Sequence, residues 1–127
     1  MHFTIERKRL IKMLQVLHKN RPGTRRNAKE VRLYACAARV FVEANDVTAG
    51  EETLVYEDGG CVVPLLMFTE LLKSYSTKEN VTIKADEKAM HIFTSTVPIT
   101  GFTKEVSPPA RFMVWQVTDT WVVGGTQ

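Results

Sequence analysis

The same order of predicted elements occurs twice along the chain, and this repetition constrains the fold more than any single motif. Each copy begins with a strand, continues with one amphipathic helix and ends with three more strands. The first copy is predicted as a strand at 1–6, a helix at 7–20, and strands at 31–37, 39–45 and 52–58. The second is predicted as a strand at 61–64, a helix at 64–75, and strands at 81–85, 89–95 and 97–102.

The connections between the predicted strands are mostly short, which favours antiparallel hairpins. Asp58-Gly59-Gly60 has the composition of a turn and is predicted to end the strand before it. Both helices carry one apolar stripe, formed by Leu10, Met13, Leu14 and Leu17 in the first and by Leu65, Phe68, Leu71, Leu72 and Tyr75 in the second. We therefore expect an α+β domain made of two βαβββ units, with antiparallel sheets and both helices packed on one side.

The C-terminal end of the chain departs from this repeat. A proline-containing segment, "SPPARF" at 107–112, interrupts the regular pattern. The residues after it, including Trp115, Trp121 and Val122, are too apolar for a free tail. We predict one domain at 1–112 and a tail at 113–127 that adds a strand to this domain or to a neighbouring one.

Composition excludes several classes of protein. No apolar run is long enough for a membrane span, and Met1 leads into a charged segment unlike a signal peptide. We expect a cytoplasmic protein that does not insert into membranes. Cys36 and Cys61 lie in apolar, strand-like runs, which favours two reduced core thiols over a disulfide or a reactive site.

The charge is strongly segregated. Residues 1–33 contain ten Lys or Arg and two acids, a net charge of +8, whereas residues 34–127 contain seven and twelve, a net charge of −5. From Arg7 to Lys29 there are nine Lys or Arg and no acid. Such asymmetry indicates a basic surface for a polyanion on a mildly acidic body.

The basic residues of the first predicted helix share one face. At 100° per residue, Lys8, Lys12, Gln15 and Lys19 fall within about 60° of one another, opposite the apolar stripe. Lys8 and Lys12 are a like-charge pair, and no acid within the helix compensates them. The following loop adds four more cations, Arg21, Arg25, Arg26 and Lys29.

Two interpretations fit this basic face. The first is contact with phosphates of a nucleic-acid backbone, which would be salt-dependent and blind to base sequence. The second is an ordinary solvated surface. The basic segment contains no aromatic residue after Phe3, which favours contact with the backbone of double-stranded DNA over stacking on single strands. A zinc finger, a Walker loop and an aromatic RNA-binding motif are all missing from the sequence.

No catalytic arrangement is recognisable, and we predict that the protein is not an enzyme. The adjacent acids Glu51-Glu52 and Asp86-Glu87 fall in predicted turns, where carboxylates are usually solvated. The three histidines are scattered and no Cys pair has metal-ligand spacing, so neither a metal nor another cofactor is expected.

These features together resemble the first domain of the bacterial sliding clamp, the beta subunit of DNA polymerase III. The resemblance extends over roughly residues 1–112. It rests on "MHFTIERKRLIKMLQ" at 1–15, "NRP" at 20–22, "FVEANDVTAGEE" at 41–52, "CVVPLLMFTELLKSY" at 61–75 and "SPPARF" at 107–112.

The resemblance implies a DNA-clamp-like domain in which two helices line a hole as wide as a duplex, with the sheets outside. Arg21-Pro22 matches an Arg-Pro pair that contacts DNA in this family, and Lys73 is the outward residue of the second helix best suited to a phosphate. The family's ring contains six such domains in two subunits, so a ring of chains like this one would need six copies. The family's peptide pocket for replication proteins lies in later domains, so the resemblance does not transfer that pocket to this chain.

Two functions are therefore carried forward. In the first, the chain is a processivity-factor-like module that binds duplex DNA without sequence preference, with self-association into a ring and contact with replication proteins as corollaries. In the second, it is a stand-alone clamp-fold module that modulates or caps another clamp through protein contacts and binds little DNA. Only the first function requires the basic face.

Overall fold

The computed structural model describes residues 1–19, 29–44, 46–115 and 121–125. The first unit comprises β1 (His2–Glu6), α1 (Arg7–Lys19), β2 (Glu30–Cys36), β3 (Arg39–Ala44) and β4 (Val47–Glu52), followed by the short β5 (Leu54–Glu57). The second comprises β6 (Gly59–Pro64), α2 (Leu65–Ser74), β7 (Asn80–Ala85), β8 (Ala89–Ile92) and β9 (Ser95–Pro98), followed by the short β10 (Gly101–Thr103). The predicted α+β class and the two βαβββ units are confirmed.

The two units exchange their first strands. β1 pairs with β7 of the second unit, and β6 pairs with β2 of the first. The short strands follow the same rule, because β5 pairs with β1 and β10 pairs with β6. The result is a five-stranded sheet in the order β5-β1-β7-β8-β9 and a seven-stranded sheet in the order β10-β6-β2-β3-β4-β11-β12. Each sheet therefore contains strands of both units.

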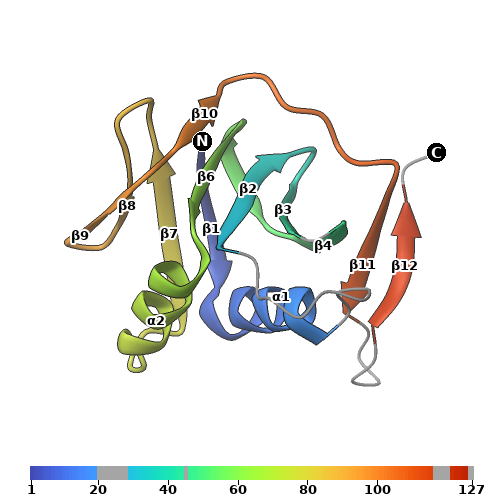
Figure 1. The fold of residues 1–127 in the computed structure, drawn as a ribbon, viewed down its shortest axis with the longest axis horizontal. Coiled ribbons are helices and arrows are strands. Elements are labelled where there is room, and N and C mark those ends of the chain that lie inside the picture. Colours follow the sequence, from blue (N-terminus) through green and yellow to red (C-terminus); the bar gives the residue numbers. More distant parts are fainter. Residues whose placement is uncertain (20–28, 45, 116–120, 126–127) are drawn as a thin grey trace.

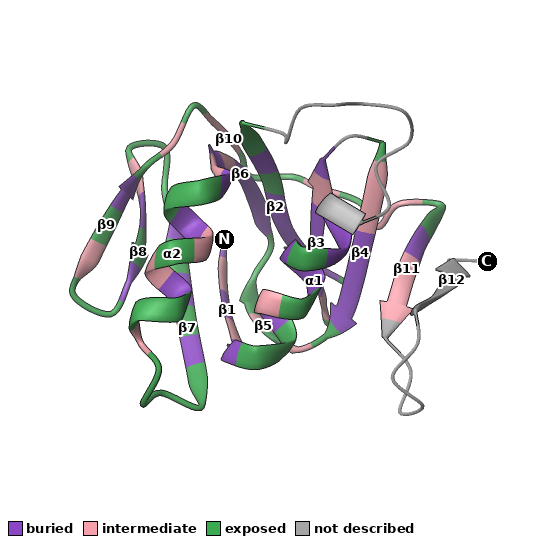
Figure 2. Ribbon diagram, turned by 60° about the horizontal axis from the view of Figure 1, so that its bottom comes forward, coloured by how far each residue is buried: buried purple, intermediate pink, exposed green. Residues whose placement is uncertain are grey.

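Both helices lie on the same side of the two sheets, as predicted (Figure 1). Their apolar stripes are buried, and exposed residues follow the outer surface of each helix (Figure 2). Of the predicted stripes, Leu10, Met13, Leu14, Leu17, Leu65, Phe68 and Leu72 are buried, while Leu71 and Tyr75 are partly buried against the core. One hydrophobic core joins the helices to the inner faces of both sheets. No helix in the described ranges is long and apolar enough to cross a membrane.

The first helix begins at Arg7 and the second follows Pro64, in agreement with the sequence. Pro64 has an extended backbone and directly precedes the helix. Proline has no backbone N–H, and this costs nothing at the start of a helix, where N–H groups have no intrahelical acceptor. Burial of the apolar stripe supplies most of the stability of such short helices, because propensity alone is marginal at this length.

Several strand predictions were wrong in detail. The predicted strand at 97–102 is divided between β9 and β10. Residues 52–58 are divided between β4 and β5, and β4 itself, Val47–Glu52, was missed. Its small and acidic residues are poor strand formers, but β4 pairs along its length with β3. At Gly50, a Cβ would lie 2.8 Å from the rings of Phe41 and Phe112, so packing against the sheet selects a residue without a side chain.

Two further corrections concern turns. The strand β5 does end before Asp58, but Gly59 and Gly60 are the first residues of β6 and not part of a turn. A Cβ on Gly60 would lie 2.8 Å from the Cβ of Tyr34 on the neighbouring strand, and this close approach explains the glycine. The predicted strand at 89–95 is interrupted after Ile92, and Phe93 adopts a left-handed conformation (φ 53°) before β9 begins.

The C-terminal segment forms two further strands, β11 (Arg111–Trp115) and β12 (Trp121–Gly125). β11 is antiparallel to β12 and parallel to β4, with Met113 opposite Ala49. Phe112 is buried in a small cluster with Tyr34, Cys36 and Phe41. β11 spans the predicted boundary between 1–112 and 113–127, and the division into domain and tail stays a prediction.

The burial of α1 predicts a stability difference between two leucines. Replacing the fully buried Leu14 with alanine should lower the free energy of unfolding by about 2–5 kcal/mol, because a cavity opens in the core. Leu66 is 74% exposed. The same change there should alter the free energy of unfolding by no more than about 0.5 kcal/mol. Urea unfolding followed by circular dichroism measures both, and equal losses in the two variants would contradict the described helix orientation.

Candidate nucleic-acid interface

The outward face of α1 presents the first three residues of the predicted interface. Lys8, Lys12 and Gln15 are exposed. Leu10, Met13, Leu14 and Leu17 are buried on the opposite side. No ion pair joins Lys8 to a described residue. The spacing of four and three residues places these side chains one turn apart along a single ridge.

Other predicted site residues occupy different places. Lys29 is exposed directly before β2, and its carbonyl oxygen accepts a hydrogen bond from the Leu65 N–H (3.0 Å). Lys29 therefore lies beside the start of α2. Lys73 is exposed in the last turn of α2, at the other end of the helix from Leu65. The side chain of Lys19, together with Arg21, Arg25 and Arg26, lies outside the described residues.

Arg7 does not belong to the outward face. Its side chain is buried, with only 9% of the residue exposed. The guanidinium donates hydrogen bonds to the carbonyl oxygens of Leu72 (3.3 Å), Ser76 (3.5 Å) and Lys78 (2.9 Å). The basic run of the sequence thus includes a cation that is used inside the fold.

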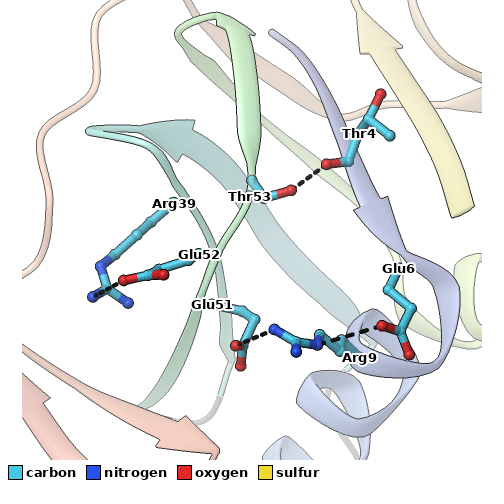
Figure 3. A network of polar contacts seen from close by, with 7 residues as sticks. All are labelled: Thr4, Glu6, Arg9, Arg39, Glu51, Glu52 and Thr53. Atoms are coloured by element: carbon cyan, nitrogen blue, oxygen red, sulfur yellow. Dashed lines mark hydrogen bonds and ion pairs between the residues drawn. The ribbon is translucent and has the colours of Figure 1, made fainter.

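Arg9 is neutralised by two carboxylates (Figure 3). Its Nη1 lies 3.0 Å from Oε1 of Glu51, and its Nε lies 3.5 Å from Oε2 of Glu6. The predicted turn at Glu51-Glu52 was therefore wrong, and so was the predicted solvation of Glu51, whereas Glu52 is exposed as predicted. Both residues lie on β4, where Glu51 is buried and Glu52 pairs with Arg39 at 3.5 Å. The sequence of the helix contains no acid and so gave no sign of these partners. Glu6 belongs to β1, directly before the helix, and Glu51 belongs to β4.

Burial controls the electrostatics of this network. It raises the pKa of Glu51 above its usual value, and the nearby guanidinium groups of Arg9 and Arg39 only partly reverse this effect. A further contact holds the connection between β4 and β5 in place, because the Thr53 hydroxyl donates to the carbonyl oxygen of Thr4 on β1 (Figure 3).

A depression of about 260 Å³ lies where α1 begins and the loop after α2 ends. The described residues that line it are Glu6, Arg7, Lys8, Ser76, Thr77, Lys78 and Glu79. Lys78 is exposed and was not among the predicted site residues. The sequence contained a signal for it, a lysine in the polar segment "STKEN". Its position beside Lys8 follows only from the β1–β7 pairing, in which Glu6 lies opposite Asn80.

Neither a metal-binding cluster nor a thiol of lowered pKa is found among the described residues. They contain no group of three or more His, Cys, Asp or Glu side chains arranged to hold a metal ion. Cys36 and Cys61 are both free and buried, as expected for core thiols. Burial raises the pKa of the Cys61 thiol to about 12, so it stays protonated and weakly nucleophilic at neutral pH.

The fold is that of a single clamp-like domain. No family model matches the chain, and no curated protein matches its sequence. Its structure is similar to the Helicobacter pylori beta clamp bound to a DNA ligase peptide, with a TM-score of 0.65 and 15% identity over 80% of this chain and 30% of that one. It is also similar to Caulobacter crescentus pol III beta, with a TM-score of 0.63 and 20% identity over 80% of this chain and 30% of that one.

A third structure, the DNA polymerase III subunit beta sliding clamp of Bartonella birtlesii, has a TM-score of 0.63 and 18% identity over 89% of this chain and 35% of that one. The resemblance to the bacterial beta clamp is therefore confirmed at the level of the fold. The chain spans 30% to 35% of the length of these three clamps.

The contributions of Glu51 and Asp86 to the free energy of unfolding should change in opposite directions as the pH falls. Because the folded pKa of Glu51 is raised, ionised Glu51 disfavours the folded state, and this cost disappears as the pH falls through the folded pKa. Backbone N–H groups of Lys88 and Ala89 lower the pKa of Asp86, so its contribution is stabilising above the usual aspartate value and is lost as the pH falls through the lowered pKa.

The measurement compares the protein with Glu51→Gln and with Asp86→Asn by urea unfolding across acidic pH. On acidification, the stability of the protein should rise relative to Glu51→Gln and fall relative to Asp86→Asn. If both differences change in the same direction, the assigned environments are incorrect.

Proposed function

We propose that the chain is a non-enzymatic, clamp-like protein that binds double-stranded DNA through its phosphate backbone without reading base sequence. The observation that carries the proposal is the outward ridge of Lys8, Lys12 and Gln15 on the same side of a clamp-like fold as α2. Lys29 and Lys73 extend the basic surface to the two ends of α2, and Lys19, Arg21, Arg25 and Arg26 are proposed to complete it. We propose that the protein acts in the cytoplasm.

The chemistry of the ridge explains why backbone contact is favoured. Lysine ammonium groups are point charges that attract phosphates without the geometric fit that a base edge requires. Gln15 adds an uncharged amide donor beside them. The sequence of α1 contains no Phe, Tyr or Trp on which a base could stack. Binding should therefore be salt-dependent and tolerant of DNA sequence.

Self-association would let single-domain chains surround a duplex. The resemblance to a six-domain ring implies six copies joined edge to edge. Such a ring needs a head-to-tail interface between two different edges of the chain, with a rotation between neighbours that closes after six copies. The five-stranded sheet ends at β5 and β9, whose outer backbone edges are available for pairing within the described part of the chain. Replication proteins are proposed partners, since a solved beta clamp of this fold is bound to a DNA ligase peptide.

A second function is favoured by the surface near β9. Leu66 is 74% exposed and Met67 48%, and Met67 lines a shallow depression together with Ser95, Thr96 and Val97 of β9. An apolar helix surface beside a strand edge suits a protein partner. In this alternative, the chain modulates or caps another clamp and binds little DNA.

Charge reversal on the ridge tests the first function. Lys8→Glu combined with Lys12→Glu should weaken binding to duplexes of unrelated sequence to a similar extent, and should reduce the salt slope, log K against log[salt], by about 2 units. Fluorescence anisotropy over a salt series measures both quantities.

The matched control is Lys84→Glu combined with Lys88→Glu, which changes the net charge equally. Lys84 is exposed on β7 between the buried Ile83 and Ala85, and Lys88 lies in the turn at the end of β7 away from the helices (Figure 1). This control should bind nearly as the unmodified protein does. Equal loss in both double variants would mean that net charge, and not the ridge, governs binding.

The two functions also differ in assembly. Native mass spectrometry over a concentration series should detect a sixfold species if single-domain chains form a ring. A strict monomer or dimer with negligible affinity for duplex DNA would reject encirclement and support the capping alternative.

A further inference from the structure

Arg7 connects the first turn of α1 to the end of α2. Its backbone N–H donates to the carbonyl oxygen of Glu79 (2.9 Å), and its guanidinium donates to the carbonyl oxygens of Leu72, Ser76 and Lys78. Leu72 lies in the last turn of α2, and the other acceptors belong to the segment that follows it. One residue of the first unit thus binds four backbone carbonyl groups of the second.

The acceptors explain why this residue is an arginine. The last carbonyl groups of a helix lack intrahelical donors and carry a partial negative charge, which a cation complements. The planar guanidinium has five N–H donors in fixed directions, so it can reach several carbonyl oxygens at once, whereas a lysine ammonium is a single point charge on a flexible stem. No ion pair with a carboxylate is found for Arg7 among the described residues.

Arg7 lines the depression together with Lys8 and Lys78. Ser76 and Thr77 add hydroxyl groups to the same surface. Two carboxylates, Glu6 and Glu79, also border it, and Glu6 is engaged by Arg9 at 3.5 Å.

The ammonium group of Lys78 has a weak aromatic contact outside the depression. It lies 5.6 Å from the centre of the Phe93 ring. A cation–π contact at an exposed site contributes little, so a phosphate can replace it. Lys78 is therefore able to turn toward a ligand shared with Lys8.

We propose that Arg7 is a positioning residue that holds the end of α2 against α1, so that Lys8 and Lys78 contact the same phosphodiester backbone. Lys78 is then a phosphate contact contributed by the loop after α2, and the depression is a shared contact point of both helical units. This inference rests on the proposed binding of duplex DNA and specifies how the second unit takes part in it.

Lys78→Gln tests the contact itself. The substitution removes an exposed charge but retains the backbone carbonyl that Arg7 binds. It should lower the magnitude of the salt slope by about 0.9, which makes the affinity change between 50 and 200 mM salt about 3.5-fold smaller. Lys88→Gln is the matched control, since it removes the same charge in an exposed turn, and Lys78→Arg should restore binding. An equal effect of Lys78→Gln and Lys88→Gln would overturn the assignment of Lys78.

Arg7→Lys tests the positioning role at constant net charge. It should weaken duplex binding and lower the salt slope even at temperatures where circular dichroism shows a folded protein, because Lys8 and Lys78 would no longer be held together. A folded Arg7→Lys variant with unchanged affinity and slope would overturn the role of Arg7. If this variant does not fold, the comparison of Lys78→Gln with Lys88→Gln decides the proposal.

The controls separate this inference from the proposed function. If the unmodified protein does not bind duplex DNA, the proposed function fails and this inference fails with it. If the unmodified protein binds and charge reversal at Lys8 and Lys12 weakens binding, while the Lys78 and Arg7 variants behave as controls, only this inference fails.

Discussion

The exchange of first strands between the two units is the constraint on which the rest of the structure depends. β1 pairs with β7 in the sheet of the second unit and β6 pairs with β2 in the sheet of the first, so each sheet includes a strand of the other unit. The exchange puts both helices on one side of the molecule and buries their apolar stripes in one core. It also brings Glu6 opposite Asn80, which sets the loop after α2 beside the first turn of α1. The candidate interface exists where it does because of this pairing.

The basic segment serves two physical purposes. Arg7 and Arg9 are used within the fold, the first on backbone carbonyl groups of the second unit and the second on Glu6 and Glu51. Lys8, between them in sequence, is exposed, since successive residues of a helix point about 100° apart. Within α1, the basic run thus contains two arginines that contact other parts of the fold and two exposed lysines, Lys8 and Lys12. The division agrees with the chemistry, because a planar guanidinium suits several fixed acceptors and a hydrated ammonium suits solvent or a phosphate.

Much of the fold could be predicted from local patterns. The 3.6-residue period located both helices and their buried leucines, and the alternation at 31–45 located the β2–β3 hairpin. The errors at β4 and at Glu51 share one physical cause. β4 is a strand because β3 pairs with it and aromatic rings cover Gly50, and neither contact is visible in the letters "VTAGEE". Glu51 was misplaced for the same reason, since its burial and its contact with Arg9 depend on a strand that the local sequence does not favour.

The sequence by itself determined the order of the elements, the buried face of each helix and the concentration of positive charge near the start of the chain. These properties depend on neighbours within one or two helical turns, or on alternation along one strand, and so local residue patterns suffice. Only the tertiary structure decided that Arg7 is buried, that Arg9 pairs with Glu6 and Glu51, and that Lys78 lines the same depression as Lys8. Those outcomes depend on contacts between segments that are far apart in sequence, such as the hydrogen bond from Arg7 to the carbonyl oxygen of Lys78. The local pattern of either segment alone does not predict such a contact.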